Sequence, residues 1–421
     1  MLLKSLKVKN FKSFKELEVN FEKFNVIIGA NASGKSNLLQ VLRFMRDIQN
    51  YGLENAVSLQ GGVTYLRNAN TPGAQEIVLE VTFETDLSTE PARYFFRGFG
   101  PETQLGVSEV TYQITLNTTA TGRSVRLANE KLSFKLEFYT EFTDKVDRRR
   151  SFIEKTRQVM ISYTRTKGRI VPDFSQLEGL ERRPGELLES RLRIGGKLTL
   201  LERPPFFPSF TIRRRWFDSI AIYDFDPKLP KRGASITAKA ELEESGSNLS
   251  LVLSKIIEDS HRKNSLGNLI VDLLPFVRKL KIQRMPDNSM LFKLQERYLG
   301  NKYLPASLLS DGTINVTALV VALYFQPRPI TIIEEPERNI HPELLGKVVQ
   351  MMKQAPQKQV IVTTHNPEVV KGVSLEQILL IYRDREGFST ITKPSDNETV
   401  RNFIESGMTV DRLFVKGLLG P

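Results

Sequence analysis

The residues from Gly29 to Ser36 have the composition and spacing of a phosphate-binding loop. Gly29, Ala30, Asn31, Ala32, Ser33, Gly34, Lys35 and Ser36 fit the pattern G-x-x-x-x-G-K-[ST]. Glycine lets the backbone wrap closely around an anion, so that successive N–H groups point at phosphate oxygens. We expect Lys35 to reach the β- and γ-phosphates of ATP and the Ser36 hydroxyl to bind Mg²⁺. A strand-like run precedes the loop and a helix-like run follows it, as the motif requires, and the predicted nucleotide-binding set extends to Asn37.

A second chemical feature is a pair of carboxylates, Glu334 and Glu335, directly after the apolar run 330–333. Acids at a buried strand end cost desolvation energy unless a cation or a proton compensates. We expect Glu334 to lie near the Mg²⁺ held by Ser36, and Glu335 to polarise the attacking water during phosphoryl transfer. A charged loop after a strand is a common alternative, and the phosphate loop favours the catalytic interpretation.

Two further segments could contact phosphate. Ser310, Asp311 and Gly312 precede a helix-like run, where a hydroxyl, N–H groups and the helix dipole could meet an anion. Taken alone, an ordinary helix N-cap explains them better, and their place before the acidic strand changes that balance. His365 follows the apolar run 359–364, and a neutral imidazole there could donate to the γ-phosphate. The alternative for His365 is a structural role in a loop.

Other conspicuous side chains give weaker signals. His341 follows the acidic strand and could lie at a subunit interface, whereas His261 and Trp216 have no interpretable context.

The elements around these residues predict an α/β fold. Apolar and polar residues alternate in 3–11 and 13–22, and again in 76–84, 107–116 and 131–139, which predicts an antiparallel β subdomain. From 290 the pattern is strand, loop, helix, strand, helix, strand, with buried parallel strands at 330–333 and 359–364.

We divide the chain by these patterns. Residues 1–135 form one ATPase lobe, 136–235 an irregular basic insertion, 236–289 a helical subdomain, and 290–421 a second ATPase lobe with a C-terminal extension. The run 217–227 could return to the core. The insertion carries two arginine triplets, Arg148–Arg150 and Arg213–Arg215, which form either a DNA-binding surface or two solvated or protein-docking loops.

Composition limits the class of protein. The chain has 421 residues, 40% hydrophobic and 26% charged, which is typical of a globular protein. Its net charge of +12 favours contact with nucleic acid or another polyanion, and the alternative is that the charge serves solubility alone. The chain has no cysteine and no run of eighteen apolar residues, so we expect neither disulfides nor a transmembrane helix, and a cytoplasmic location.

In combination these motifs resemble the ABC-type ATPases of the SMC and RecF group, most closely the AAA-21-type and OLD-like ATPases. The segment 29–36 matches the Walker A motif, Ser310 to Thr313 resembles the ABC signature, and Glu334 and Glu335 match Walker B and the catalytic glutamate. Arg338 to His341 falls where the D-loop lies, and His365 matches the switch histidine. Asp311 stands where transporter-type relatives have a second glycine, and Glu334 replaces the usual aspartate. Gln60 and Gln75 are the candidates for the Q-loop glutamine by position alone.

The resemblance implies an ABC-type P-loop head with a mixed sheet, binding ATP and Mg²⁺ in a head-to-tail homodimer. Each ATP would then lie between Walker A of one subunit and the signature of the other. No long coiled coil is evident, and the residues after His365 lack the acidic metal-binding motifs of an appended nuclease. We therefore expect an ATP-driven switch in prokaryotic genome defence or maintenance that controls a separate effector, such as a nuclease or toxin. We do not expect it to bind a membrane. The alternatives are a RecF-like DNA-repair ATPase and a non-hydrolysing scaffold.

Overall fold

The computed structural model describes the chain except for residues 86–92, 96–102, 120, 123, 144–150, 167–168, 174, 178–197, 203–215 and 421. Both arginine triplets lie outside the described residues. The chain divides into two compact units. The first contains Met1–Phe21, Ser36–Ser219 and Tyr382–Ile391, and the second contains Glu22–Lys35, Ile220–Ile381 and Thr392–Pro421.

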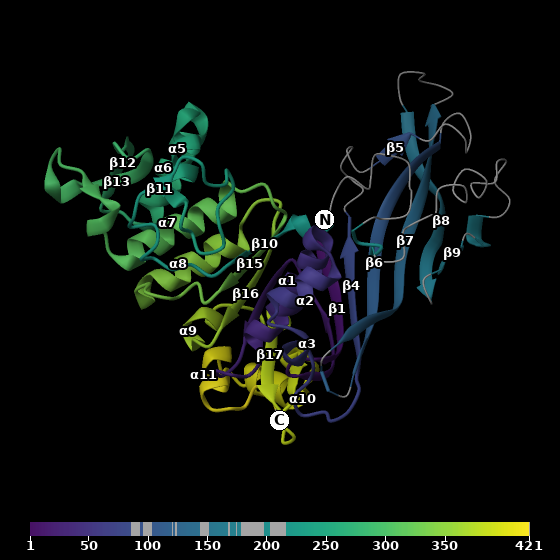
Figure 1. Ribbon diagram of the computed structural model, residues 1–421. Helices are drawn as coiled ribbons and strands as arrows, with labels where there is room; N and C mark the ends of the chain where they lie inside the picture. The colour runs from purple at the N-terminus through teal and green to yellow at the C-terminus, as the bar shows by residue number, and fades with distance from the viewer. Residues whose placement is uncertain are drawn as a thin grey trace. The chain divides into compact units, whose positions relative to one another are not determined.

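The first unit contains a long antiparallel sheet with the strand order β2-β1-β4-β6-β7-β8-β9, and β5 pairs with β6 (Figure 1). The strands are β1 (Leu2–Phe11), β2 (Phe14–Asn20), β4 (Glu76–Glu84), β5 (Arg93–Phe95), β6 (Thr103–Thr118), β7 (Val125–Thr143), β8 (Ser151–Thr166) and β9 (Arg169–Asp173). Alternation builds them: in β4, the side chains of Ile77, Leu79, Val81 and Phe83 are buried. The antiparallel β subdomain predicted from the sequence is confirmed.

The helices described in this unit include α1 (Lys35–Tyr51), α2 (Leu53–Leu59) and α3 (Val63–Leu66). Helix α1 packs on β1 through Phe44 and Phe11, whose ring centroids are 5.8 Å apart. Trp216 has a structural setting: it begins the short 3-10 helix η3 (Trp216–Ser219), and its ring lies 5.8 Å from that of Phe134.

The prediction of an irregular insertion after residue 136 is wrong where the chain is described. Strand β7 continues to Thr143, and β8 and β9 extend the sheet further. Val159, Ile161 and Tyr163 of β8 alternate into the core. Between them, Met160 is apolar but exposed and Ser162 is polar but buried, so the sequence of β8 lacks a clear alternation of apolar and polar residues.

A six-stranded sheet has the order β10-β15-β16-β3-β17-β18, and the second unit contains β10, β15, β16, β3 and most of β17. The strands of this sheet are β10 (Ile220–Tyr223), β15 (Ile330–Glu334), β16 (Gln359–Thr364), β3 (Phe24–Ile28), β17 (Ile378–Arg383) and β18 (Ser389–Thr392). The first five are parallel and almost wholly buried, as apolar runs of this length predict. The return of the run 217–227 to the core is confirmed by β10.

Helices cover this sheet on the side where Figure 1 labels α7, α8 and α9. They are α7 (Asp311–Tyr324), α8 (Pro342–Lys353) and α9 (Pro367–Val370), followed by α10 (Glu398–Glu405) and α11 (Val410–Val415). Helix α7 is buried from Thr313 to Leu323, because most of these residues are apolar and the polar Thr317 and Asn315 side chains are hydrogen-bonded. The predicted alternation of strands and helices after residue 290 is confirmed.

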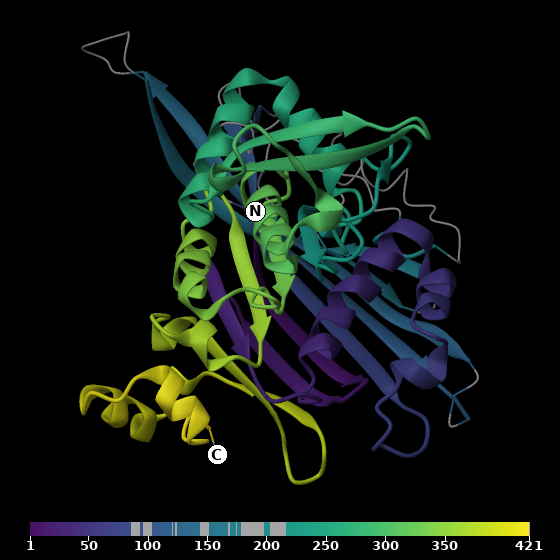
Figure 2. The same cartoon turned by 90° about the vertical axis from the view of Figure 1, so that its left-hand side faces the viewer.

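The expected helical region 236–289 contains strands as well. Helices α5 (Leu249–Glu258) and α6 (Ser260–Leu273) are followed by β12 (Val277–Arg284) and β13 (Ser289–Glu296), a hairpin that runs across the upper part of Figure 2. Strands β11 (Ala234–Ser235) and β14 (Leu304–Pro305) pair with β13. The helical prediction is wrong for β12, where Leu280 and Ile282 alternate with exposed charged and polar residues.

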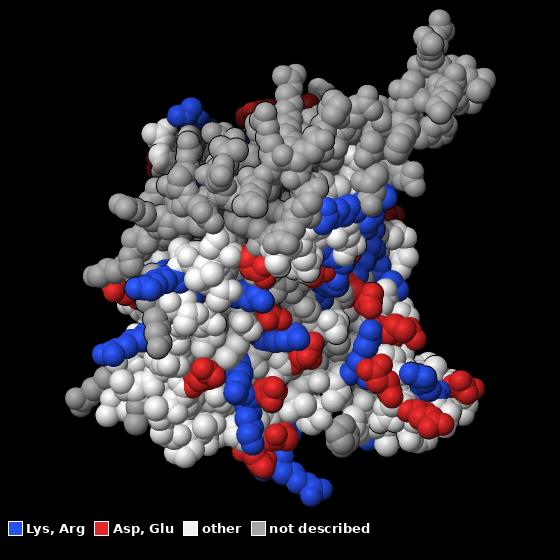
Figure 3. Space-filling model, turned by 90° about the vertical axis from the view of Figure 1, so that its right-hand side faces the viewer, with Lys and Arg blue, Asp and Glu red and all other residues white. Residues whose placement is uncertain are grey.

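The described surface carries charges of both signs, and the described helices are short or polar. Figure 3 shows Lys and Arg interspersed with Asp and Glu over the described part of one face, rather than gathered in a single patch. Within the described residues, no helix is long and apolar enough to cross a membrane.

Candidate functional site

Three neighbouring strands of the second unit end at the same edge of the parallel sheet. The register pairs Glu334 of β15 with Thr363 of β16, and Thr364 of β16 with Ile28 of β3. Past the strand ends, Gly29 N donates to Thr364 O at 3.3 Å, and Glu335 N donates to Thr363 O at 2.8 Å. The phosphate loop, the acidic turn and the histidine segment therefore begin side by side, although they are far apart in the sequence.

The phosphate loop closes around its own lysine. Lys35 Nζ donates to Gly29 O at 2.8 Å and to Ala30 O at 2.9 Å, and the residue is 8% exposed. Burial lowers the pKa of Lys35, while the negative charges of the nearby glutamates of the acidic turn oppose that shift. The Lys35 ammonium group is therefore held inside the loop by backbone carbonyl oxygens.

Backbone geometry explains the residue types in this loop. A Cβ at Gly29 would lie 2.2 Å from Ile381 O, which leaves room only for glycine. Gly34 has φ 115° and Ala32 has φ 61°, so the loop turns through left-handed conformations. Asn37 donates through Nδ2 to Ser13 Oγ at 2.8 Å, within the first unit, so its side chain has a structural partner.

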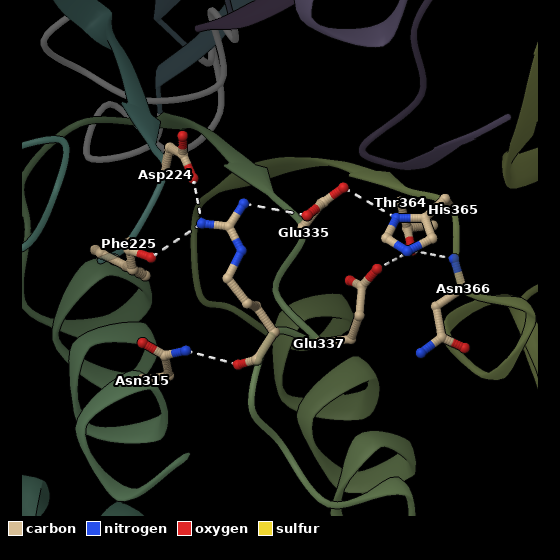
Figure 4. Close-up of polar contacts among 9 residues, drawn as sticks. Asp224, Phe225, Asn315, Glu335, Glu337, Thr364, His365 and Asn366 are labelled. Carbon is tan, nitrogen blue, oxygen red and sulfur yellow. Dashed lines mark hydrogen bonds and ion pairs between the residues drawn. The ribbon is translucent and has the colours of Figure 1, made fainter. Parts of the chain in front are cut away.

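The acidic turn holds Glu335 between two cationic or polar groups, as Figure 4 shows. One carboxylate oxygen is 2.9 Å from His365 Nδ1, and the other accepts from Arg338 Nη2 at 3.1 Å. Burial raises the pKa of the Glu335 carboxyl, but the bonds and charges of Arg338 and His365 outweigh it, so the pKa lies below its ordinary value. Glu335 is therefore a carboxylate with both oxygens engaged.

The bond to Glu335 also determines the tautomer of His365. A carboxylate only accepts hydrogen bonds, so Nδ1 of His365 carries the proton. Nε2 of the neutral ring is then an acceptor. Donation from His365 to a phosphate would require a protonated ring or a broken bond to Glu335, which refines the role expected from the sequence.

The sequence did not predict that Arg338, Asp224, Asn315 and Glu337 would join this network. Arg338 Nη1 donates to Asp224 Oδ1 at 2.9 Å, and Asn315 Nδ2 donates to Arg338 O at 2.6 Å. Glu337 is 8% exposed and accepts a hydrogen bond from Thr364 Oγ1, and burial raises its pKa. Glu337 and Arg338 were visible as charged residues beside Glu335, whereas Asp224 could be found only from the order of the strands.

The candidate signature residues lie at the start of α7. Ser310 is exposed and caps the helix, with Oγ accepting from Thr313 N at 3.2 Å. Asp311 forms an ion pair with Lys231, Nζ to Oδ1 2.5 Å. A Cβ at Gly312 would lie 2.5 Å from Asn339 O, so glycine permits the close approach of the D-loop segment. The structure thus joins the two segments within one chain.

The remaining candidates are placed as follows. His341 caps α8, with Nδ1 accepting from Glu343 N at 3.4 Å, and its side chain is 73% exposed. His261 is exposed on α6. Gln75 is buried in the first unit, where Nε2 donates to Asn68 O at 2.8 Å and Oε1 accepts from Asn68 N. Gln60 Nε2 donates to Gln40 Oε1 at 3.1 Å. The amide of Gln75 is already used in the fold, which disfavours it as the Q-loop residue.

Comparisons with known proteins bear on the family and the fold of the chain. Residues 24–371 match the family described as "AAA domain, putative AbiEii toxin, Type IV TA system". The DNA replication and repair protein RecF of Chlamydia caviae is 39% identical over 87 residues, 20% of this chain and 21% of that protein. The Septu protein PtuA of Bacillus mycoides is 29% identical over 134 residues, 28% of this chain and 18% of that protein. The chain thus spans about a fifth of the length of these curated relatives.

A solved structure shares the fold. The SMC head bound to the C-terminal winged-helix domain of ScpA superposes with a TM-score of 0.50 at 18% identity, covering 93% of this chain and 98% of that one. Because the family match covers most of the chain and the site has the expected order of motifs, the chain belongs to this AAA-domain family and is an ABC-type ATPase of the SMC and RecF group.

Proposed function

We propose that this chain binds ATP with Mg²⁺ and hydrolyses it at the carboxyl edge of the parallel sheet. The observation that carries the proposal is the bond of 2.9 Å between Glu335 and His365, formed where the loop around Lys35 also begins. Lysine, glutamate and histidine from three adjacent strand ends are the groups that phosphoryl transfer needs for charge stabilisation and for positioning water.

Each residue of the edge has a role in this proposal. The N–H groups of residues 30–37 and Lys35 bind the phosphates, and Lys35 exchanges its bonds to Gly29 O and Ala30 O for phosphate oxygens. Glu335 orients the attacking water, and His365 fixes the Glu335 carboxylate and lies beside the γ-phosphate.

The residues present suit a magnesium ion. Ser36 follows Lys35 in the chain and Glu334 ends β15, and both offer hard oxygen ligands. Mg²⁺ needs only one or two protein ligands, because it takes its other ligands from phosphate and water. When bound, the ion would neutralise charge on the phosphates.

The active form in this proposal is a head-to-tail homodimer. Ser310, Asp311 and Gly312 start α7, and their exposed end offers a hydroxyl and helix N–H groups to an ATP carried by a second chain. ATP binding would then favour the dimer and hydrolysis would release it, which makes the chain a switch.

The switch would act on a separate effector protein, such as a nuclease or toxin, in prokaryotic genome defence or maintenance. The likeness to PtuA supports the defence setting. The likeness to RecF supports one alternative, a DNA-repair ATPase that contacts DNA.

Glu335→Gln tests the proposal, because glutamine keeps the shape and removes the charge that orients water. We expect normal affinity for ATP by calorimetry, phosphate release reduced by about a hundredfold or more, and an ATP-dependent dimer that persists in size-exclusion chromatography. Glu343→Gln is the matched control, since Glu343 is 91% exposed on α8 and should leave turnover unchanged. Full turnover in Glu335→Gln would show that this edge does not catalyse hydrolysis. A parent chain that binds ATP and never hydrolyses it would support the scaffold instead.

A further inference from the structure

Both the side chain and the backbone of Arg338 are held by hydrogen bonds. Its guanidinium donates to Asp224 Oδ1 at 2.9 Å and to Glu335 Oε2 at 3.1 Å, through two different nitrogens. Nη1 also lies 3.4 Å from Phe225 O. The Arg338 backbone is held as well, because N donates to Glu335 O at 3.0 Å and O accepts from Asn315 Nδ2 at 2.6 Å.

The anchors of Arg338 are themselves fixed. Asn315 is 3% exposed on α7, and Phe225 is 7% exposed and stacks on Tyr223 with ring centroids 5.2 Å apart. Asp224 N donates to Glu244 O at 2.9 Å, which holds the chain just after β10. Figure 4 shows Asp224, Glu335 and His365 following one another along a single line of contacts. The guanidinium is therefore presented to Glu335 from a rigid support.

Glu335 needs such support because of where it lies. Its φ is 44°, in the left-handed region that non-glycine residues rarely adopt, and its side chain projects from a turn rather than from a strand. With one oxygen bound to His365 and the other to Arg338, the plane of the carboxylate is defined. Each carboxylate oxygen accepts more than one hydrogen bond, so both can still bind a water.

We propose that Arg338, backed by Asp224, is a positioning residue for hydrolysis that orients the Glu335 carboxylate toward the attacking water. This inference rests on the proposed function of Glu335. It assigns a task to the arginine that follows the acidic turn and to the aspartate that follows β10, and it explains why one guanidinium joins two carboxylates. Arginine suits the task because its planar fork binds two partners in fixed directions, which an ammonium group cannot do.

The effect should fall on turnover rather than on ATP binding. In the proposed function the phosphate-binding groups belong to the loop around Lys35. Arg338→Ala should therefore leave KM for ATP, and the affinity for a non-hydrolysable ATP analogue, within about twofold of the parent values. Misorientation of the catalytic carboxylate should reduce kcat by about ten- to a hundredfold. Arg338→Lys should recover part of this loss, because lysine restores charge without the second arm. Asp224→Asn should reduce kcat by about threefold, since the amide oxygen still accepts a hydrogen bond.

Arg328 provides a matched control. It also joins a carboxylate and a backbone carbonyl of the β10 segment, with Nη2 to Glu241 Oε2 2.6 Å and Nη1 to Ile220 O 3.2 Å. Arg328→Ala should lower the unfolding midpoint about as much as Arg338→Ala does and leave kcat unchanged. Equal unfolding shifts with an unchanged kcat in both variants would make Arg338 a structural tie and overturn the inference.

A double-mutant cycle with Glu335→Gln separates the remaining outcomes. If Arg338 acts through Glu335, Arg338→Ala should reduce residual single-turnover hydrolysis little further in the Glu335→Gln background. Independent, multiplicative losses, or a raised KM, would show that Arg338 contacts the nucleotide and would overturn the inference alone. A raised kcat in Arg338→Ala would overturn it too, because Arg338 would then restrain Glu335. Full activity in Glu335→Gln would overturn the proposed function and this inference together.

Discussion

The two loops that precede helices α1 and α7 both offer hydrogen-bond donors that could bind phosphate, but Lys35 of the first loop is buried and Ser310 of the second is exposed. Before α1, the loop is folded on itself, with Lys35 8% exposed and bound to the carbonyls of Gly29 and Ala30. Before α7, Ser310 is exposed and its helix is buried from Thr313 onward. The first loop is organised by its own chain, whereas the second presents its polar end outward. In our proposal this difference separates binding of ATP in one subunit from capping of that ATP by another.

The largest effect should come from the organised loop. Lys35→Ala removes the charge that binds the β- and γ-phosphates, and we expect ATP affinity to fall by about a hundredfold or more in calorimetry. Lys353→Ala is the control, since Lys353 has only a 3.4 Å contact with Gly372 O at an exposed position. Unchanged affinity in a folded Lys35→Ala variant would contradict the phosphate-loop assignment.

A mixing experiment tests whether the two loops act on the same ATP from different chains. Lys35→Ala and Ser310→Arg should each abolish turnover alone. In a mixed dimer one site carries both changes and the other carries neither. Random exchange makes half of the dimers mixed, each with one intact site of two, so about a quarter of the parent rate should return.

The outcome depends on exchange and on coupling between sites. Mixed dimers should first be demonstrated, for example by native mass spectrometry with one variant isotope-labelled. No recovery despite mixed dimers would mean either that the two sites fire only together or that Ser310 does not act in trans. A crosslink between positions 33 and 310 that forms only between chains, and only with ATP, would distinguish these cases.

The comparison also shows what the sequence could predict. The phosphate loop, the acidic pair and His365 could be found because each directly follows an apolar strand, and parallel strands end at one edge. The side chain that bridges Glu335 to Asp224 could not be predicted, because the partners are 114 residues apart and meet only through the pairing of β10 with β15. The fold class was predictable for a related reason: the buried parallel strands are uninterrupted apolar runs.

The two wrong predictions have different physical origins. In β8, Met160 is exposed while Ser162 and Arg165 are buried, which breaks the alternation of apolar and polar residues. In β12, exposed charged residues lie between the inward-facing positions and hide the alternation. In β12, Lys279, Lys281 and Arg284 are exposed at the edge of a small sheet, where positive charge also discourages pairing with other chains. Only tertiary pairing with β13 makes β12 a strand, and that contact lies outside local propensity.

A smaller effect is expected at Asp311, which stands where transporter-type relatives have a second glycine. A carboxylate at the start of α7 would repel the triphosphate of an ATP that Ser310 approaches, and the ion pair with Lys231 offsets that charge. Lys231→Ala should therefore lower turnover, and by only about fivefold because the ion pair is partly exposed and screened. The ATP affinity of the isolated subunit should change little. Adding Asp311→Asn should restore most of the loss, since the unpaired carboxylate causes it. Lys228→Ala, in the same loop and exposed, is the control. If Lys231→Ala reduces turnover and Asp311→Asn does not rescue it, Lys231 acts on the nucleotide or the dimer directly, and the departure from glycine needs no compensation.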